Sequence, residues 1–478
     1  MVDTGGVLDA VVVGSGPNGL AAAVALARAG HSVTVLEGAD TIGGGTRSEE
    51  LTVPGVIHDL CSAVHPFGLA SPFFASLPLE EHGLVWRYPE IDLAHPLDDG
   101  SAGVMVRSLE ETCAGLGVDG PAWRRAFAPV VDGFADLADD ILGPVLRWPA
   151  HPVRMARFGL RGGLPASLFV RRFRTPQAKA LFGGSAAHVF RPLDRPATAS
   201  VAMMLFAAGH VHGWPVAEGG SASITHALAS LLRSLGGTIV TGHPVTSRAD
   251  LPAARVTLYD TGPGAVADIL GEELPGGTRR AYRRWKYGPG SFKVDLAVRG
   301  GIPWTNEAAR RAGTVHLGGT FEEIAEAEAA VCAGRMPERP FVLLAQQSLA
   351  DPTRAVGDVH PVWAYAHVPA RWSGPGEQIV LDQIERFAPG VRERIVATAV
   401  RDPAGFAADN PNYVGGDIAG GANNLTQLVG RPKILGDPYA TGVPGHYLCS
   451  SATPPGAGVH GMCGYRAAAR ALTYLGAG

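Results

Sequence analysis

The residues with the clearest chemical meaning lie in a glycine-rich turn near the start of the chain. The turn runs from Gly14 to Gly19, and an acidic residue, Glu37, follows eighteen positions later. The first glycine allows a tight turn, the second lets backbone approach a pyrophosphate, and the third allows a helix to pack closely on a strand. An acid at this distance reaches the hydroxyls of an adenosine ribose. The pattern predicts a dinucleotide site formed by Gly14, Ser15, Gly16, Pro17, Asn18, Gly19 and Glu37.

Three predicted elements position this turn. Residues 10–13 predict a strand, residues 20–28 predict an alanine-rich helix closed by Gly30, and residues 32–36 predict a second strand that ends at the acid. The start of such a helix offers N–H donors and the positive end of its dipole to a phosphate. Both NAD and FAD fit this unit, and the alternative is a glycine-rich turn that binds nothing.

The residues after Glu37 distinguish between the two cofactors. Gly43, Gly44 and Gly45 free the backbone beside a ligand, and Arg47 can pair with a phosphate. This continuation resembles the flavin amine oxidase superfamily, in which the paired glycines and the arginine follow the pyrophosphate toward the isoalloxazine ring. The resemblance favours FAD and implies contacts from Gly38, Gly43, Gly44, Thr46 and Arg47. A surface arginine after a flexible loop is the alternative.

Two distant segments also resemble FAD-contacting parts of that superfamily. Residues 219–245 are similar to its second FAD-contacting unit, in which the backbone at Val245 meets the adenine, although alone they predict only a helix, a turn and a strand. Residues 446–464 predict a strand that leads to a glycine-rich helix entrance, suited to placing amides against the flavin. The pattern from Thr453 to Gly461 resembles the phytoene desaturase branch. The resemblance implies contacts from Ser451, Gly458, Val459, His460 and Met462.

The similarity extends to the bacterial phytoene dehydrogenase-related proteins through residues 58–66, 287–293 and 410–417. The chain also departs from the carotenoid desaturases, because His460 replaces a typical proline and Ser450-Ser451 replaces a Gly-Ala pair. A carotenoid substrate therefore does not follow. A second glycine fingerprint with its acid is absent from the sequence, so dedicated binding of a pyridine nucleotide is not supported.

Lys293, His65 and His460 are the catalytic candidates. Residues 287–299 predict a strand on which Lys293 and Asp295 share one face. In amine-oxidising relatives a lysine after a similar Gly-Ser strand start holds a water at flavin N5, and Lys293 resembles it. The alternative is a solvated strand face with a weak ion pair. His65 and His460 lie in segments expected near the flavin, either as an acid or base or as interior histidines bonded to backbone.

The resemblance implies an α/β fold in which a discontinuous Rossmann-type (GR2-like) FAD-binding domain is interleaved with other parts. We expect this domain over residues 1–96, 209–268 and 430–478. A helical cap is expected over residues 97–208, and an α+β substrate domain over residues 269–429.

Composition excludes several classes of protein. The net charge of −4 gives no basic field for nucleic acid. The five cysteines form no Cys-x-x-Cys pair, which argues against a disulfide framework or zinc site, and no metal is expected. The start of the chain has no basic residue, and the apolar runs are shorter than the ~20 residues that span a bilayer. We therefore expect a cytoplasmic protein with a small-molecule partner.

A basic and aromatic segment, from His151 to Arg174, has two interpretations. Its arginines alternate with Phe and Leu and no acid intervenes. It could contact a membrane surface where a lipophilic substrate enters, or it could be a solvated part of the cap.

Together these features predict an FAD-dependent oxidoreductase. It would transfer a hydride from a substrate C–H to flavin N5 and give a C=C or C=N product, with oxygen or a quinone as the final acceptor. The alternatives are a flavin-dependent polyene isomerase and a flavin-bearing scaffold without turnover.

Overall fold

Residues 8–36 fold as strand, helix and strand, as the sequence predicted. β1 (Leu8–Val13) is followed by α1 (Pro17–Arg28) and β2 (Val33–Leu36). α1 begins before the predicted helix because proline at its first position has a suitable φ and sacrifices no hydrogen bond. The computed structural model describes residues 7–476, so the outermost residues of the expected FAD-binding domain, 1–6 and 477–478, lie outside it.

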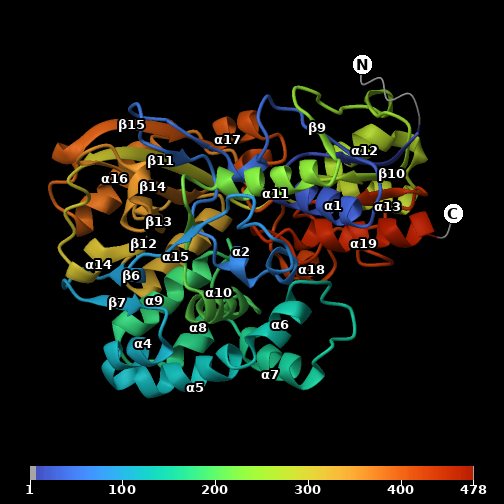
Figure 1. Ribbon diagram of the computed structural model, residues 1–478. Coiled ribbons are helices and arrows are strands. Elements are labelled where there is room, and N and C mark those ends of the chain that lie inside the picture. The colour runs from blue at the N-terminus through green and yellow to red at the C-terminus, as the bar shows by residue number, and fades with distance from the viewer. Residues whose placement is uncertain (1–6, 477–478) are drawn as a thin grey trace.

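These strands belong to a parallel sheet that collects segments from the whole chain (Figure 1). Its strand order within the described residues is β16-β10-β1-β2-β9. The added strands are β9 (Thr238–Val240), β10 (Ala254–Tyr259) and β16 (His446–Leu448). The helices packed around it are α11 (Ala222–Ser234), α12 (Pro263–Leu270), α13 (Gly276–Arg283) and α19 (Met462–Gly476). β1 buries Ala10 and Val12 toward α1, α11 and α19, and Val11 and Val13 toward α12 and α13. A parallel sheet with helices on both faces is the predicted Rossmann architecture.

A second sheet builds the other half of the molecule. Its order within residues 7–476 is β15-β11-β14-β13-β12-β6-β7. Its strands are β6 (Ile91–Pro96), β7 (Ala102–Met105), β11 (Gly290–Arg299), β12 (Ala312–Leu317), β13 (Val342–Ala345), β14 (Val359–Val368) and β15 (Ile395–Arg401). Nearby helices are α14 (Glu307–Arg311), α15 (Phe321–Cys332), α16 (Gly376–Phe387) and α17 (Pro403–Asp409).

The two faces of the second sheet differ in chemistry. One face is aliphatic and packs with α16 through Val294, Leu296 and Ile384. The opposite face presents Lys293, beside its strand partner Tyr365. This polar and aromatic face turns toward the Rossmann part and forms one boundary of the interior between them.

Helices between residues 109 and 212 form the cap beneath both sheets (Figure 1). They are α4 (Leu109–Gly115), α5 (Gly120–Val131), α6 (Phe134–Ile141), α7 (Pro152–Gly162), α8 (Ala166–Phe169), α9 (Pro176–Ala187) and α10 (Ala199–His212). The aromatic cluster at its centre contains Trp123, Phe127 and Phe206. Among the described residues no helix is both long and apolar enough to cross a membrane.

Short elements connect these parts. They are β3 (Ser48–Glu49), β4 (His58–Asp59), β5 (Trp86–Arg87), β8 (Val216–Ala217), α2 (Pro66–Ala70), α3 (Pro72–Ala75) and α18 (Leu425–Val429). β6 pairs with β12 in the second sheet, although the expected boundary at residue 96 would have placed it in the FAD-binding domain.

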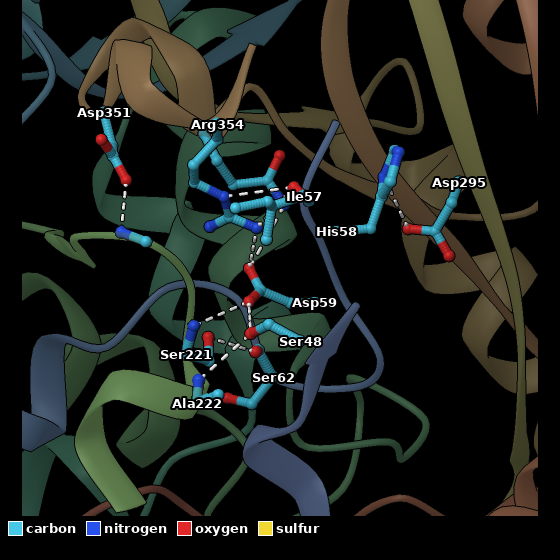
Figure 2. Close-up of polar contacts among 12 residues, drawn as sticks. Ser48, Ile57, His58, Asp59, Ser62, Ser221, Ala222, Asp295, Asp351 and Arg354 are labelled. Atoms are coloured by element: carbon cyan, nitrogen blue, oxygen red, sulfur yellow. Dashed lines mark hydrogen bonds and ion pairs between the residues drawn. The ribbon is translucent and has the colours of Figure 1, made fainter. Parts of the chain in front are cut away.

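A buried ion pair ties the two halves together (Figure 2). Arg354 ends the short 3-10 helix η7 (Pro352–Arg354), and its guanidinium lies 2.8 Å from the Asp59 carboxylate at the end of β4. Both side chains are fully buried. Arg354 also donates to the carbonyl of Ile57 at 3.1 Å, and Asp59 accepts from the backbone N–H of Ser221 at 2.8 Å. Burial opposes ionisation of Asp59, but Arg354 and these donors hold its pKa below the usual value.

This junction fixes the segment that follows it. The hydroxyl of Ser221 donates to the carbonyl of Ser62 at 2.7 Å and bonds the His65 ring at 2.7 Å. Because Asp59 also holds the start of α11 at Ser221, residues 59–65 are attached to both halves. The sequence singled out residues 58–66 without indicating Arg354 as their partner.

The first prediction concerns this ion pair. We expect Arg354→Met to lower the free energy of unfolding by about 3–5 kcal/mol, because it leaves the Asp59 charge buried without its partner. The double variant Arg354→Met, Asp59→Asn should recover most of that loss. Urea denaturation followed by circular dichroism measures both, with the exposed Arg284→Met as control. A cost below about 1 kcal/mol for Arg354→Met would show that the pair does not hold the junction.

Candidate functional site

The turn between β1 and α1 requires its glycines. Gly14 has a φ of +98°, a conformation that disfavours other residues. A Cβ on Gly19 would lie 2.1 Å from the carbonyl oxygen of Gly14, which leaves no space for a side chain. The backbone N–H groups of Gly16 and Asn18 have no partner within residues 7–476, and both residues line the cavity described below. Free amides at the start of a helix suit a pyrophosphate.

Glu37 stands at the end of β2, where the sequence placed it. Its carboxylate accepts from the backbone N–H of Ser15 at 2.9 Å and from that of Ala39 at 2.9 Å. Arg47 contacts the same carboxylate at 3.5 Å and donates to the carbonyl of Thr41 at 3.0 Å. The acid is therefore held in place at the edge of the cavity, and the expected phosphate ligand, Arg47, lies beside it.

Sequence reasoning missed Asp260, a carboxylate at the same turn. It follows β10 and accepts from the backbone N–H of Gly19 at 2.8 Å. Burial raises the pKa of Asp260 to about 7, the Gly19 donor opposes the rise, and the Glu37 charge adds to it. Its position beside the glycine turn comes only from the pairing of β1 with β10.

A single continuous cavity of about 1180 Å³ runs through the site. It extends from Glu37 and Val245, along the β1–α1 turn and residues 44–47, past residues 455–460, to the polar face of the second sheet and the cap. The predicted residues in its wall are Gly14, Ser15, Gly16, Pro17, Asn18, Glu37, Gly38, Gly44, Thr46, Arg47, His65, Val245, Ser451, Gly458, Val459 and His460. Gly19, Gly43, Met462 and Lys293 lie outside that wall.

Features at both ends of this cavity fit an extended dinucleotide. Val245 lines one end, and neither its N–H nor its carbonyl has a partner in the described chain. At the other end the N–H of Met462 donates to His460 Nδ1 at 3.1 Å, while His460 Nε2 has no partner in residues 7–476. Together with the free amides at the glycine turn, these groups suit adenine, pyrophosphate and flavin in that order, so FAD fits the residues present.

Lys293 lies in the middle of β11 with its side chain 1 % exposed. Its ammonium contacts Asp295, and Asp295 lies 3.5 Å from His58 (Figure 2). Burial lowers the pKa of Lys293, and the Asp295 charge opposes that shift. The side chain is thus not on a solvated strand face. It stands one layer behind the wall, where its strand partner Tyr365 and the neighbouring Cys61 line the cavity.

His65 and His460 are buried and uncharged at neutral pH. Burial lowers the pKa of each to about 4, and for His65 the Asp59 charge opposes the shift. The Nδ1 atom of His65 has no partner among the described residues. Both rings can therefore offer one free nitrogen to a bound molecule.

The far end of the cavity contains a histidine that sequence reasoning missed. His188 follows α9 and lines the wall beside Phe190, and its Nε2 lies 3.1 Å from that of His316. Burial lowers the pKa of His188 to about 3. No spacing pattern pointed to it, because its neighbours come from other strands and helices.

The motifs at residues 287–293 and 410–417 meet beside this site. Asp417 accepts from the backbone N–H of Gly288 at 2.7 Å, and Asn412 accepts from that of Gly262 at 2.7 Å. Tyr413 lines the cavity, and a Cβ on Gly45 would lie 2.3 Å from its hydroxyl. The second motif therefore fastens the start of β11 to the loop that carries the expected phosphate contacts.

Comparison with known proteins agrees with this arrangement. The family model described as an NAD(P)-binding Rossmann-like domain matches residues 12–75. The mouse pyridine nucleotide-disulfide oxidoreductase domain-containing protein 2 is 26% identical, over 96% of this chain and 92% of its own. Hydroxyneurosporene desaturase from Rhodobacter capsulatus is 25% identical over 94% of each chain.

Solved structures show the same fold. A putrescine oxidase crystallised with putrescine superimposes with a TM-score of 0.61 and 19% identity, covering 98% of this chain and 99% of that one. The chain is homologous to pyridine nucleotide-disulfide oxidoreductase domain-containing protein 2 and to the hydroxyneurosporene desaturases. It is thus a flavin-type oxidoreductase, built on a Rossmann domain of the FAD-binding type.

Proposed function

We propose that this chain is an FAD-dependent dehydrogenase that introduces a C=C bond into a lipophilic substrate. The observation that carries the proposal is the apolar far end of the cavity. Its wall there includes the side chains Phe67, Phe158, Met204, Leu205, Phe190 and Leu343. Such a surface binds hydrocarbon by removing it from water.

The carboxylate of Asp140 at this end of the cavity is already occupied by donors of the cap, which favours a neutral substrate over an alkylammonium ion. Asp140 is the acid that the cap contributes to the wall, and its oxygens already accept from the backbone N–H groups of Ala150 at 2.7 Å and His151 at 2.9 Å. The Trp363 N–H and the Thr314 hydroxyl are buried without a partner in residues 7–476. One small polar group on an otherwise apolar substrate would satisfy them.

Forming a C=C bond removes a hydride from one carbon and a proton from its neighbour. FAD bound along the cavity supplies the hydride acceptor, and oxygen or a quinone takes the two electrons afterwards. We propose that His188 accepts the proton, because it lines the far end of the cavity and its Nε2 lies 3.1 Å from that of His316. Burial lowers its pKa to about 3, so it is a weak base and must pass the proton on at once. His65 and His460 are proposed as neutral hydrogen-bonding groups that orient what is bound beside them.

Substrate-driven loss of the oxidised flavin absorbance tests this function. Without oxygen, a long-chain polyene or alkene should bleach the flavin, and an alkylamine of matched length should not. His188→Gln keeps a hydrogen bond to His316 but accepts no proton, so bleaching should slow by roughly 10²-fold or more at unchanged FAD content. His82→Gln, whose ring bonds Ser230 on α11, is the matched control.

Each other result contradicts part of the proposal. Bleaching by amines alone would make the protein an amine oxidase. Product with a shifted double bond and no net bleaching would indicate an isomerase. Unchanged rates in His188→Gln would remove that residue from the reaction.

Lys293 is proposed to act on the flavin through a water, as the resemblance to amine oxidases implies. Lys293→Met alone would leave Asp295 buried and unpaired, so the informative variant is Lys293→Met, Asp295→Asn. We expect this double variant to fold and bind FAD while air reoxidation of the reduced flavin slows by roughly 10²-fold, since a preorganised donor is lost. Stopped-flow absorbance measures the rate. Reoxidation at the wild-type rate would leave the pair with a structural role only.

Asp260 predicts a pH dependence of cofactor affinity. Its pKa of about 7 lies above the ordinary value of 3.8 because of burial, and a pyrophosphate at the glycine turn would raise it further. Binding therefore takes up a proton above pH 7, and affinity falls as pH rises, by at most about tenfold per unit. FAD titration of the apoprotein between about pH 6 and 9 measures this slope. Asp260→Asn should flatten it, whereas the exposed Asp358→Asn should not.

A further inference from the structure

Exposed apolar side chains gather on one part of the cap. Trp148 is 86% exposed and Leu160 is 78% exposed, and both are large enough to be unusual in contact with water. We define the cap patch as Val145, Leu146, Trp148, Val153 and Leu160. The first three lie in the connection between α6 and α7, and the last two lie on α7. The buried aromatic residues of the segment, including Phe158 and Phe169, do not belong to it.

Helix α7 presents the cap patch on its outer face. Val153, Arg157 and Leu160 are spaced four and three residues apart, so they lie on one side of the helix. Phe158 and Gly162 on the other side are buried. An apolar stripe that faces outward in this way indicates a surface that contacts another molecule or a membrane in the working protein.

The charge around the cap patch is positive. Residues 142–174 contain seven arginines and no aspartate or glutamate. The acids facing α7 come from α6, where Asp136 pairs with Arg154 and with His151, and Asp140 pairs with Arg147. Arg157, between the two apolar residues of α7, forms no ion pair within the described chain.

The same segment forms part of the cavity wall. Pro144, Val145, Pro149, Met155 and Phe158 line the cavity from the inside, while the cap patch lies on the outside. Val145 belongs to both surfaces. One thin layer of chain therefore separates the apolar end of the cavity from the exterior.

We propose that the cap patch rests on an anionic lipid bilayer. Tryptophan and aliphatic side chains insert into the headgroup region, and arginines beside them pair with lipid phosphates. A second copy of the chain fits less well, because a symmetric contact would place Arg157 of one copy, which forms no ion pair within the described chain, against the arginine-rich segment of the other. A lipophilic molecule could then pass from the bilayer across residues 144–159 into the cavity. This route rests on the proposed function, whereas the lipid contact does not.

Vesicle sedimentation of the FAD-loaded protein tests the contact. The probes are phosphatidylcholine vesicles with and without phosphatidylglycerol. We expect binding to the anionic vesicles, and a loss of roughly tenfold in the Trp148→Ser, Leu160→Ser variant, which removes two inserted apolar groups and no cavity residue. Arg157→Glu should weaken binding to anionic vesicles and leave binding to neutral ones unchanged. Val400→Ser on the distant edge strand β15 and Arg284→Glu after α13 are matched controls.

Three outcomes would contradict the proposed lipid contact. Absence of sedimentation with either vesicle would overturn the proposal, as would binding that the cap variants do not change. Dimerisation in analytical ultracentrifugation that the same variants abolish, without vesicle binding, would assign the cap patch to a second copy instead. The vesicle measurement needs no substrate, so its result does not depend on whether the protein carries out the proposed dehydrogenation.

Discussion

The site depends on close contact between three pieces of backbone at the start of α1. Gly19 packs against Gly14, and Gly464 of α19 packs against Asn18, where a Cβ would lie 1.8 Å from the Asn18 carbonyl oxygen. The absence of side chains at both places lets the C-terminal helix lie directly on the glycine turn. Residues 455–460 consequently enter the same cavity as residues 14–18. Without this approach the two ends of the chain could not surround one cofactor.

Polar groups fix the remaining segments around that centre. The Asp59–Arg354 ion pair attaches residues 59–65 to both halves of the molecule, and Asp417 fastens the start of β11. Both arrangements are buried, so each carboxylate needs its donors in place. Contacts of this kind bring together motifs that are far apart in sequence, as Asp417 does for residues 287–293 and 410–417.

Burial also explains the shifted pKa values of the titratable side chains at the site. The histidines near the cavity are neutral because burial penalises the charged ring, with a pKa of about 4 for His65 and about 3 for His188. The same burial acts in the opposite direction on Asp260, whose pKa rises to about 7. The histidines in the wall therefore carry no charge where an apolar molecule would lie.

A resemblance to the flavin amine oxidase superfamily indicated FAD and many of the residues that line the cavity, whereas the sequence by itself determined the Rossmann unit. Local spacing was sufficient there, because residues 10–47 form a continuous strand, turn, helix and strand whose glycines act on their own backbone. The burial of Lys293 beside Asp295, and the positions of Asp260, His188 and Arg354, were decided by tertiary structure. Each depends on which strand or helix packs against it, and chain spacing carries no record of those partners. The cap shows the same division: its arginines were visible in the sequence, but only packing decided that Phe158 turns inward while Trp148 and Leu160 remain exposed.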